Sequence, residues 1–294
     1  KSFFTVNQFI SPLQPQEMTS LAFEGDLSLN YFNNFFKAGY IQRGHDYNSY
    51  GSSFLRNDIK GYTFQDRLRL LNNTLFISGG YEVYEDNLKE IKPFTTTFTT
   101  ISSSVAWFPG FELPGITLGY NRYMNSNESI NATPISPAFA VDDATNRYSV
   151  QINYALKAYT THQTSVSFAY SDREDNSFNN NDVSNMSLYL SSNSRWTDLL
   201  SSSFSFGLNN ATLISGEYNY VTLLGGVRYS VLPEKLIAGA SFSPSFGDFK
   251  RLSFDFDAEY FIVQQWSILG TFCYNDNADY LDDLIFSVST RFML

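Results

Sequence analysis

The sequence predicts an all-β fold, a transmembrane antiparallel up-and-down β-barrel of about sixteen strands. Three observations lead to this prediction. Apolar and polar residues alternate in segment after segment, the composition is rich in aromatic residues but poor in charge, and the connections between segments are unequal in length.

The alternation is clearest in residues 251–261, which read RLSFDFDAEYF. Every even-numbered position there is apolar, whereas the odd-numbered positions include Asp255, Asp257 and Glu259. A period of two places alternate side chains on opposite faces of a sheet, so one face meets an apolar phase and the other meets water or cations. The pattern recurs in residues 21–31, 148–159, 164–170, 185–191, 221–231 and 285–294.

The composition indicates what the apolar phase is. Charged residues make up 16% of the chain and aromatic residues 17%, whereas a water-soluble protein carries about 25% charged residues. The chain contains no run of about 18 apolar residues, the length that a transmembrane helix needs. A barrel with an apolar outside and a neutral-polar inside fits both facts. A soluble β-sandwich or solenoid is the alternative, and it requires that the protein stay in solution without detergent.

Short turns alternate with longer loops. This rhythm is typical of outer-membrane barrels, which have tight periplasmic turns and longer external loops. Both chain ends then fall on the short-turn side, which requires an even number of strands, with residues 1–10 as one of them. We expect residues 1–294 to form a single transmembrane barrel domain, either whole or the carboxyl-terminal part of a longer barrel. The longer loops are expected at residues 45–58, 85–94, 125–146, 171–185, 209–219 and 275–283.

The last segment adds a resemblance. FSVSTRFML has large or β-branched residues at every second position, from Phe286 to Leu294. It resembles the closing strand of bacterial outer-membrane barrels, although that strand ends in an aromatic residue where this chain has Leu294. Residues 66–87 and 140–154 are similar in style to porin-like barrels of Bacteroidota-type envelopes. The resemblance implies a location in the bacterial outer membrane and no specific activity.

Charged residues on the polar parity form the candidate pore lining. Ion-selective pores use facing patches of charged side chains, whose field is focused by low-dielectric walls. The alternative is that these charges pair with each other and fill the interior, as in narrow barrels. The candidates are Glu24, Asp26, Arg67, Arg69, Glu82, Lys157, Arg228, Asp255, Asp257 and Glu259.

Aromatic residues gather near the expected strand ends, and all three tryptophans lie beside expected short turns. Amphipathic rings prefer the headgroup level of a bilayer, where two girdles of them border the apolar band of a barrel. The alternative is that aromatic residues are simply good strand formers. The candidate girdle consists of Trp107, Trp196, Tyr260 and Trp266.

Other chemistry has little support in the sequence. The only histidines are His45 and His162, and the chain has no glycine-rich phosphate loop, CxxC or HExxH motif. The acidic loops at 171–185 and 275–283 lack the spacing of a calcium-binding EF-hand. We therefore expect no enzymatic activity, no cofactor and no metal. A net charge of −10 argues against nucleic acid as a partner.

The function that these observations favour is a pore for passive passage of ions or small hydrophilic solutes. The alternative is a barrel that acts as a membrane anchor or as a component of an envelope protein complex without conducting. The expected partners are the lipid bilayer and its outer-membrane lipids, together with further copies of the chain or other envelope proteins.

Overall fold

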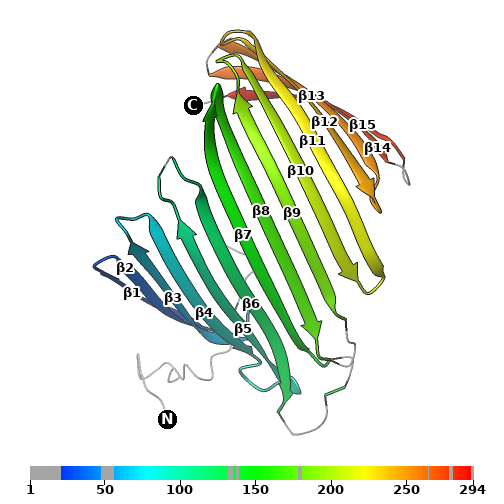
Figure 1. Cartoon of the computed structure of the whole chain (residues 1–294). Coiled ribbons are helices and arrows are strands. Elements are labelled where there is room, and N and C mark those ends of the chain that lie inside the picture. Colours follow the sequence, from blue (N-terminus) through cyan, green and yellow to red (C-terminus); the bar gives the residue numbers. More distant parts are fainter. Residues whose placement is uncertain are drawn as a thin grey trace, which may run out of the picture. The chain divides into compact units, whose positions relative to one another are not determined.

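The computed structural model describes residues 21–47, 56–110, 112–130, 135–136, 139–177, 181–263, 265–277 and 281–292. Fifteen strands form one sheet in sequence order, so each strand pairs with its neighbours along the chain (Figure 1). Among the described residues, no helix is long and apolar enough to cross a membrane. The first eight strands are β1 (Ala22–Tyr31), β2 (Asn34–Arg43), β3 (Ile59–Leu70), β4 (Leu75–Asp86), β5 (Phe94–Trp107), β6 (Gly115–Ser129), β7 (Asp142–Ala158) and β8 (Thr160–Asp175). The remaining strands are β9 (Val183–Arg195), β10 (Leu200–Leu213), β11 (Gly216–Leu232), β12 (Leu236–Gly247), β13 (Arg251–Val263), β14 (Trp266–Asn277) and β15 (Asp283–Phe292).

The chain divides into two compact units. Unit 1 contains β1 to β4 and unit 2 contains β9 to β15, while β5 to β8 contribute residues to both. The expectation of a single barrel domain over residues 1–294 stays a prediction.

In unit 2, the register of β9 to β15 separates two faces. Residues paired directly across strands point to the same side of a sheet. Phe254 pairs with Phe242 and Tyr274, and Asp255 pairs with Ser241 and Cys273. The predicted alternation therefore continues from strand to strand, and it gives unit 2 one apolar and one polar face.

Unit 1 is built in the same way. On β3, Phe64 pairs with Ala38 and Tyr81 on the apolar face, whereas Thr63 pairs with Gly39 and Glu82 on the polar face. The predicted parity of residues 21–31 also holds, because Leu27 pairs with Ala38 and Asp26 with Gly39.

The apolar faces are not covered by protein. Only Ile59 and Ala144 are buried hydrophobic residues in the described part of the chain. On the apolar faces, Tyr62 is 51% exposed and Phe256 50% exposed. Large exposed apolar surfaces are rare on soluble monomers, whereas lipid covers such a surface on a membrane barrel. This arrangement argues against the soluble sandwich.

Several expected loops are shorter than the sequence indicated. The loop expected at 209–219 is instead a tight hairpin, in which β10 ends at Leu213 and β11 begins at Gly216. Gly216 has a positive φ of 137°, which a residue without a side chain adopts easily. β7 and β8 also extend into residues expected to be loop. Strand ends beyond an apolar phase have two polar faces, so the alternation that predicts a strand fades there.

The expected strand count of about sixteen compares with fifteen described strands. The additional strand was assigned to residues 1–10, which lie outside the described residues.

Candidate functional site

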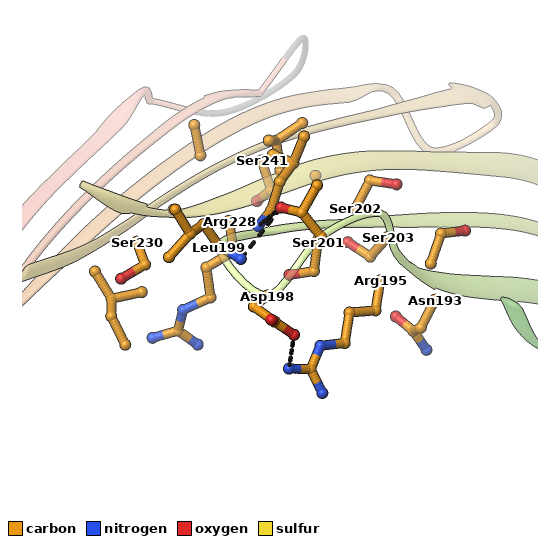
Figure 2. Close-up of a pocket in the computed structure, with 18 of the residues that line it drawn as sticks. Asn193, Arg195, Asp198, Leu199, Ser201, Ser202, Ser203, Arg228, Ser230 and Ser241 are labelled. Atoms are coloured by element: carbon orange, nitrogen blue, oxygen red, sulfur yellow. Dashed lines mark hydrogen bonds and ion pairs between the residues drawn. The ribbon is translucent and has the colours of Figure 1, made fainter. Parts of the chain in front are cut away.

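The polar face of unit 2 is hollowed into a cavity of about 1000 Å³. Hydroxyl and amide side chains are the largest group in its wall, with charged residues and several apolar ones, such as Leu199, among them (Figure 2). The lining includes Gln163 of β8, Asn193 and Arg195 of β9, Ser201 and Ser203 of β10, Arg228 of β11, Ser241 of β12, and Asp257 and Glu259 of β13.

Two glycines on this wall make room for the side chains of neighbouring strands. A β-carbon at Gly226 would lie 2.7 Å from Ser203 Oγ and 3.4 Å from Ser241 Cβ. A β-carbon at Gly239 would overlap the Asp257 carboxylate. The absence of a side chain at Gly239 lets the Asp257 carboxylate lean across β12.

An ion-pair cluster forms over Gly239. Arg228 Nη2 lies 3.3 Å from Asp257 Oδ2 and 3.9 Å from Glu259 Oε2. The register places Gly239 of β12 between Arg228 and Asp257. Ser267 Oγ also donates a hydrogen bond of 2.8 Å to Glu259 Oε1. Two carboxylates therefore share one guanidinium, which leaves one formal negative charge in excess.

Asp255 differs from the two carboxylates beside it. Ser241 Oγ and Ser253 Oγ each donate to its Oδ2 over 3.4 Å, which is long for such a bond. Asp255 makes no ion pair with any described residue. Its charge is thus the least compensated of the three.

A second, more exposed ion pair borders the same cavity. Arg195 Nη2 lies 2.8 Å from Asp198 Oδ1, and Figure 2 shows this pair apart from Arg228. The side chains of Arg195 and Asp198 are 69% and 93% exposed. Sequence reasoning missed this pair. The odd parity of Arg195, shared with Asn193 and Ser191, was the available signal.

A neighbouring hollow of about 580 Å³ shares Gln163 and Asn193 with the first one. Phe108 and Leu113 line part of it, together with Asn153 and Ser191. The polar surface of unit 2 therefore continues beyond the charged cluster.

The candidate residues of unit 1 lie on its polar face by register. Asp26 Oδ2 pairs with Lys37 Nζ at 2.9 Å, and Glu24 Oε2 pairs with Arg43 Nη2 at 3.7 Å. These two pairs agree with the alternative in which interior charges compensate each other.

The other unit 1 candidates are less compensated. Arg67, Arg69 and Glu82 share the polar face but make no ion pair within the described part of the chain. Lys157, in unit 2, is exposed near the end of β7. The assignment of the ten candidates to a pore lining stays a prediction.

The candidate girdle residues lie at strand ends. Tyr260 pairs with Ile268, and Trp266 pairs with Phe292, on the apolar face of unit 2. Trp107 is the last residue of β5. Trp196 follows β9, and its Nε1 donates to Ser202 Oγ at 2.8 Å. Their role at the headgroup level stays a prediction.

The two histidines make local contacts. His45 Nδ1 lies 3.6 Å from Asp58 Oδ2. His162 Nδ1 lies 2.7 Å from Ser194 Oγ, and its Nε2 lies 3.1 Å from the carbonyl oxygen of Ala158. No carboxylate contacts His162 within the described residues, so its surroundings lack the acid of a catalytic triad.

No protein-family model and no curated protein matches the sequence. Among solved structures, the ferric-catecholate import receptor Fiu from E. coli K12, in an open form, matches with a TM-score of 0.58 at 9% identity. The match covers 92% of this chain and 60% of the receptor, so this chain spans less than two thirds of that protein.

The fold is that of a bacterial outer-membrane β-barrel protein. This finding confirms the predicted fold class and resemblance and, together with the exposed apolar faces, the predicted outer-membrane location. The resemblance to Bacteroidota-type barrels in particular stays a prediction.

Two further structures have TM-scores too low to bear on the fold. A bacterial polysaccharide outer membrane secretin gives 0.34 at 9% identity over 95% of this chain and 100% of that chain. A triple mutant of the Rhodopseudomonas blastica porin gives 0.27 at 10% identity over 92% of this chain and 99% of that chain.

Proposed function

We propose that the protein forms a pore in the outer membrane for passive passage of ions or small hydrophilic solutes, without enzymatic activity. The observation that carries this proposal is the cavity on the polar face of unit 2, about 1000 Å³ in volume, whose lining contains many hydroxyl, amide and charged side chains beside a few apolar ones. Serine and glycine residues in the wall have small side chains or none, which leaves room in the cavity for water.

The charge of the polar face supports a preference for cations. Arg228, Asp257 and Glu259 line the cavity, and Asp255 lies on the same face of β13. Together these four residues carry three negative charges and one positive charge. Fixed charges next to low-dielectric walls focus their field into the pore. Because Arg228 lies beside Asp257 and Glu259, the carboxylate of Asp255, which makes no ion pair with a described residue, is the group most available to a passing cation.

Reversal potentials in planar bilayers under a salt gradient test the proposal. Asp255→Asn should shift the reversal potential toward anions, and Arg228→Gln should shift it toward cations. Both shifts should be larger near 0.01 M salt, where screening extends over about 30 Å, than near 1 M, where it extends over about 3 Å. Phe256→Leu, on the apolar face, is the control and should leave the reversal potential unchanged.

Failure of this test has a defined meaning. Folded protein that gives no discrete conductance steps contradicts the pore and favours the anchor or complex component. Conductance steps whose reversal potential is unchanged in both Asp255→Asn and Arg228→Gln would place the conducting path away from this cavity.

A further inference from the structure

One carboxylate, that of Asp66, lies on the apolar face of unit 1. The register of β2 to β4 pairs Asp66 with Phe36 on one side and Gly79 on the other. On β3 itself, Phe64 and Leu68 share the parity of Asp66. Asp66 is exposed, and it makes no hydrogen bond or ion pair with any described residue.

The position is exceptional among the ladders whose register is known, those of β1 to β4 and β9 to β15. The other charged residues on their apolar faces lie at strand ends. Lys60 and Glu85, for example, form the last apolar-face row of β3 and β4 and pair with each other at 3.2 Å. Asp66 instead lies inside the apolar band.

Strand geometry gives its depth. Successive rows on one face are two residues apart, which is about 6.6 Å along a strand and about 5 Å along the membrane normal at a tilt of about 40°. The rows from Leu70 to Lys60 thus span about 25 Å, the height of the apolar band of a barrel. Asp66, in the third row from Leu70, lies about 10 Å above the first row.

The surroundings of Asp66 form a notch. Gly79, beside Asp66, has no side chain, and a β-carbon there would have only the Ser102 carbonyl oxygen, at 4.0 Å, within contact range. Ile77 and Tyr81, two residues before and after Gly79, are 39% and 41% exposed. A side chain from outside can therefore enter over Gly79 and reach the carboxylate.

We propose that this notch is a docking site for a membrane-embedded segment of a different protein, which inserts a lysine or arginine side chain against Asp66. A charged side chain inside a bilayer is costly unless it is paired, and such residues mark functional contacts. A cation compensates a carboxylate better than a neutral donor does.

A second copy of this chain fits the notch less well. Copies in one membrane have the same orientation, so they meet at equal depth. The cation on the apolar face of β1 to β4 is Lys60, which lies about 15 Å from Asp66 along the membrane normal. Lys60 is also already paired with Glu85. The apolar face of β9 to β15 carries no lysine or arginine at the described paired positions.

The test uses the reconstituted protein and a synthetic transmembrane helix as the probe. The helix consists of leucine and alanine with one lysine at the depth of Asp66, and the matched helix has leucine at that position. The protein carries Cys273→Ser and Asp46→Cys, so that a single dye in a unit 1 loop reports association by energy transfer in phosphatidylcholine vesicles. We expect the lysine helix to bind about threefold to thirtyfold more tightly than the leucine helix.

The variants distinguish binding of the helix at the notch from nonspecific association with the protein. Asp66→Leu should abolish the preference for the lysine helix, and Gly79→Leu should weaken it by filling the notch while keeping the carboxylate. Gln65→Leu, one residue away on the polar face, should leave the preference intact. Asp66→Leu should also fold at least as well as the unaltered protein, because leucine suits a lipid-facing position.

Three results would overturn the proposal. Equal binding of the two helices would show that Asp66 takes no cation at this depth. A preference that survives Asp66→Leu would place the binding elsewhere. An oligomer of the protein alone that dissociates on Asp66→Leu would make a second copy the occupant.

Discussion

Arg228 of β11 reaches Asp257 of β13 across Gly239 of β12, and the guanidinium and carboxylate lie 3.3 Å apart. The contact joins strands that are not hydrogen-bonded to each other, so it depends on the strand between them. Gly239 permits it because a side chain at that position would occupy the space of the Asp257 carboxylate. The pair therefore links three strands of the polar face.

The energetic value of this pair can be measured by a double-mutant cycle. The side chains are 51% and 38% exposed, so solvent screens their attraction. We expect a coupling free energy of about 0.2 to 1 kcal/mol between Arg228→Gln and Asp257→Asn. Urea titrations of folding into lipid vesicles provide the measurement, and additive effects of the two substitutions would contradict the contact.

The orientation of β14 predicts a difference between adjacent residues. Phe272 lies on the apolar face between Phe256 and Phe286. Arginine at Phe272 should cost about 2 to 4 kcal/mol of folding free energy near the bilayer midplane. Arginine at Thr271, on the polar face beside Asp257, should cost much less. Similar costs at both positions in the same titration would refute the assignment of faces.

Two glycines of unit 1 should respond differently to alanine. A β-carbon at Gly61 would overlap the backbone oxygen of Val83 and lie 3.0 Å from the α-carbon of Tyr84. Backbone atoms yield less easily than side-chain ends, so Gly61→Ala should cost roughly 1 to 3 kcal/mol. Gly79→Ala meets open space and should be nearly neutral in the same folding titration. An unchanged folding free energy in Gly61→Ala would show that β3 and β4 are farther apart than in the structure.

Asn87 holds the connection between β4 and β5. Its Nδ2 donates to the carbonyl oxygens of Lys92 at 2.9 Å and Phe94 at 2.8 Å, and its Oδ1 accepts from the Lys92 amide at 2.9 Å. The side chain is buried and the backbone φ is 60°. Asn87→Gly keeps the backbone conformation but removes these bonds, so loop opening should become easier by roughly 1 to 3 kcal/mol.

Hydrogen exchange of the Lys92 amide reports this opening. Lys89→Ala, in the same connection but exposed, is the control and should leave the exchange rate unchanged. Unchanged exchange in Asn87→Gly would mean that the three bonds do not hold the loop.

The length of the strands was harder to infer than their existence. Residues 209–219 read as a loop because Asn209, Asn210 and Gly216 are common in turns. In the structure Asn209 pairs with Tyr220, and Asn210 with Asn219, in a continuous ladder. Cross-strand pairing overrode local propensity there, as it does where a hairpin partner is available.

Part of the candidate site was also accessible from sequence, and part was not. The parity of residues 251–261 placed Asp255, Asp257 and Glu259 on one face, and the ladders of β12 and β14 keep them there. Their different surroundings could not be inferred, because Arg228 and Ser267 come from other strands. The parity of Asp66 with Phe64 and Leu68 was equally visible, but its neighbours Phe36 and Gly79 were not.

The sequence by itself determined which residues of a strand share a face, because the side-chain period of a strand is two whatever the partner. It also indicated that the apolar face meets lipid, since the chain has little charge for a soluble protein, and the exposure of that face was found in the structure. Only the tertiary structure decided which charges meet. Register is a relation between segments distant in sequence, and a shift of one residue would have exchanged every neighbour. That register places Gly239 between Arg228 and Asp257, and Gly79 beside Asp66.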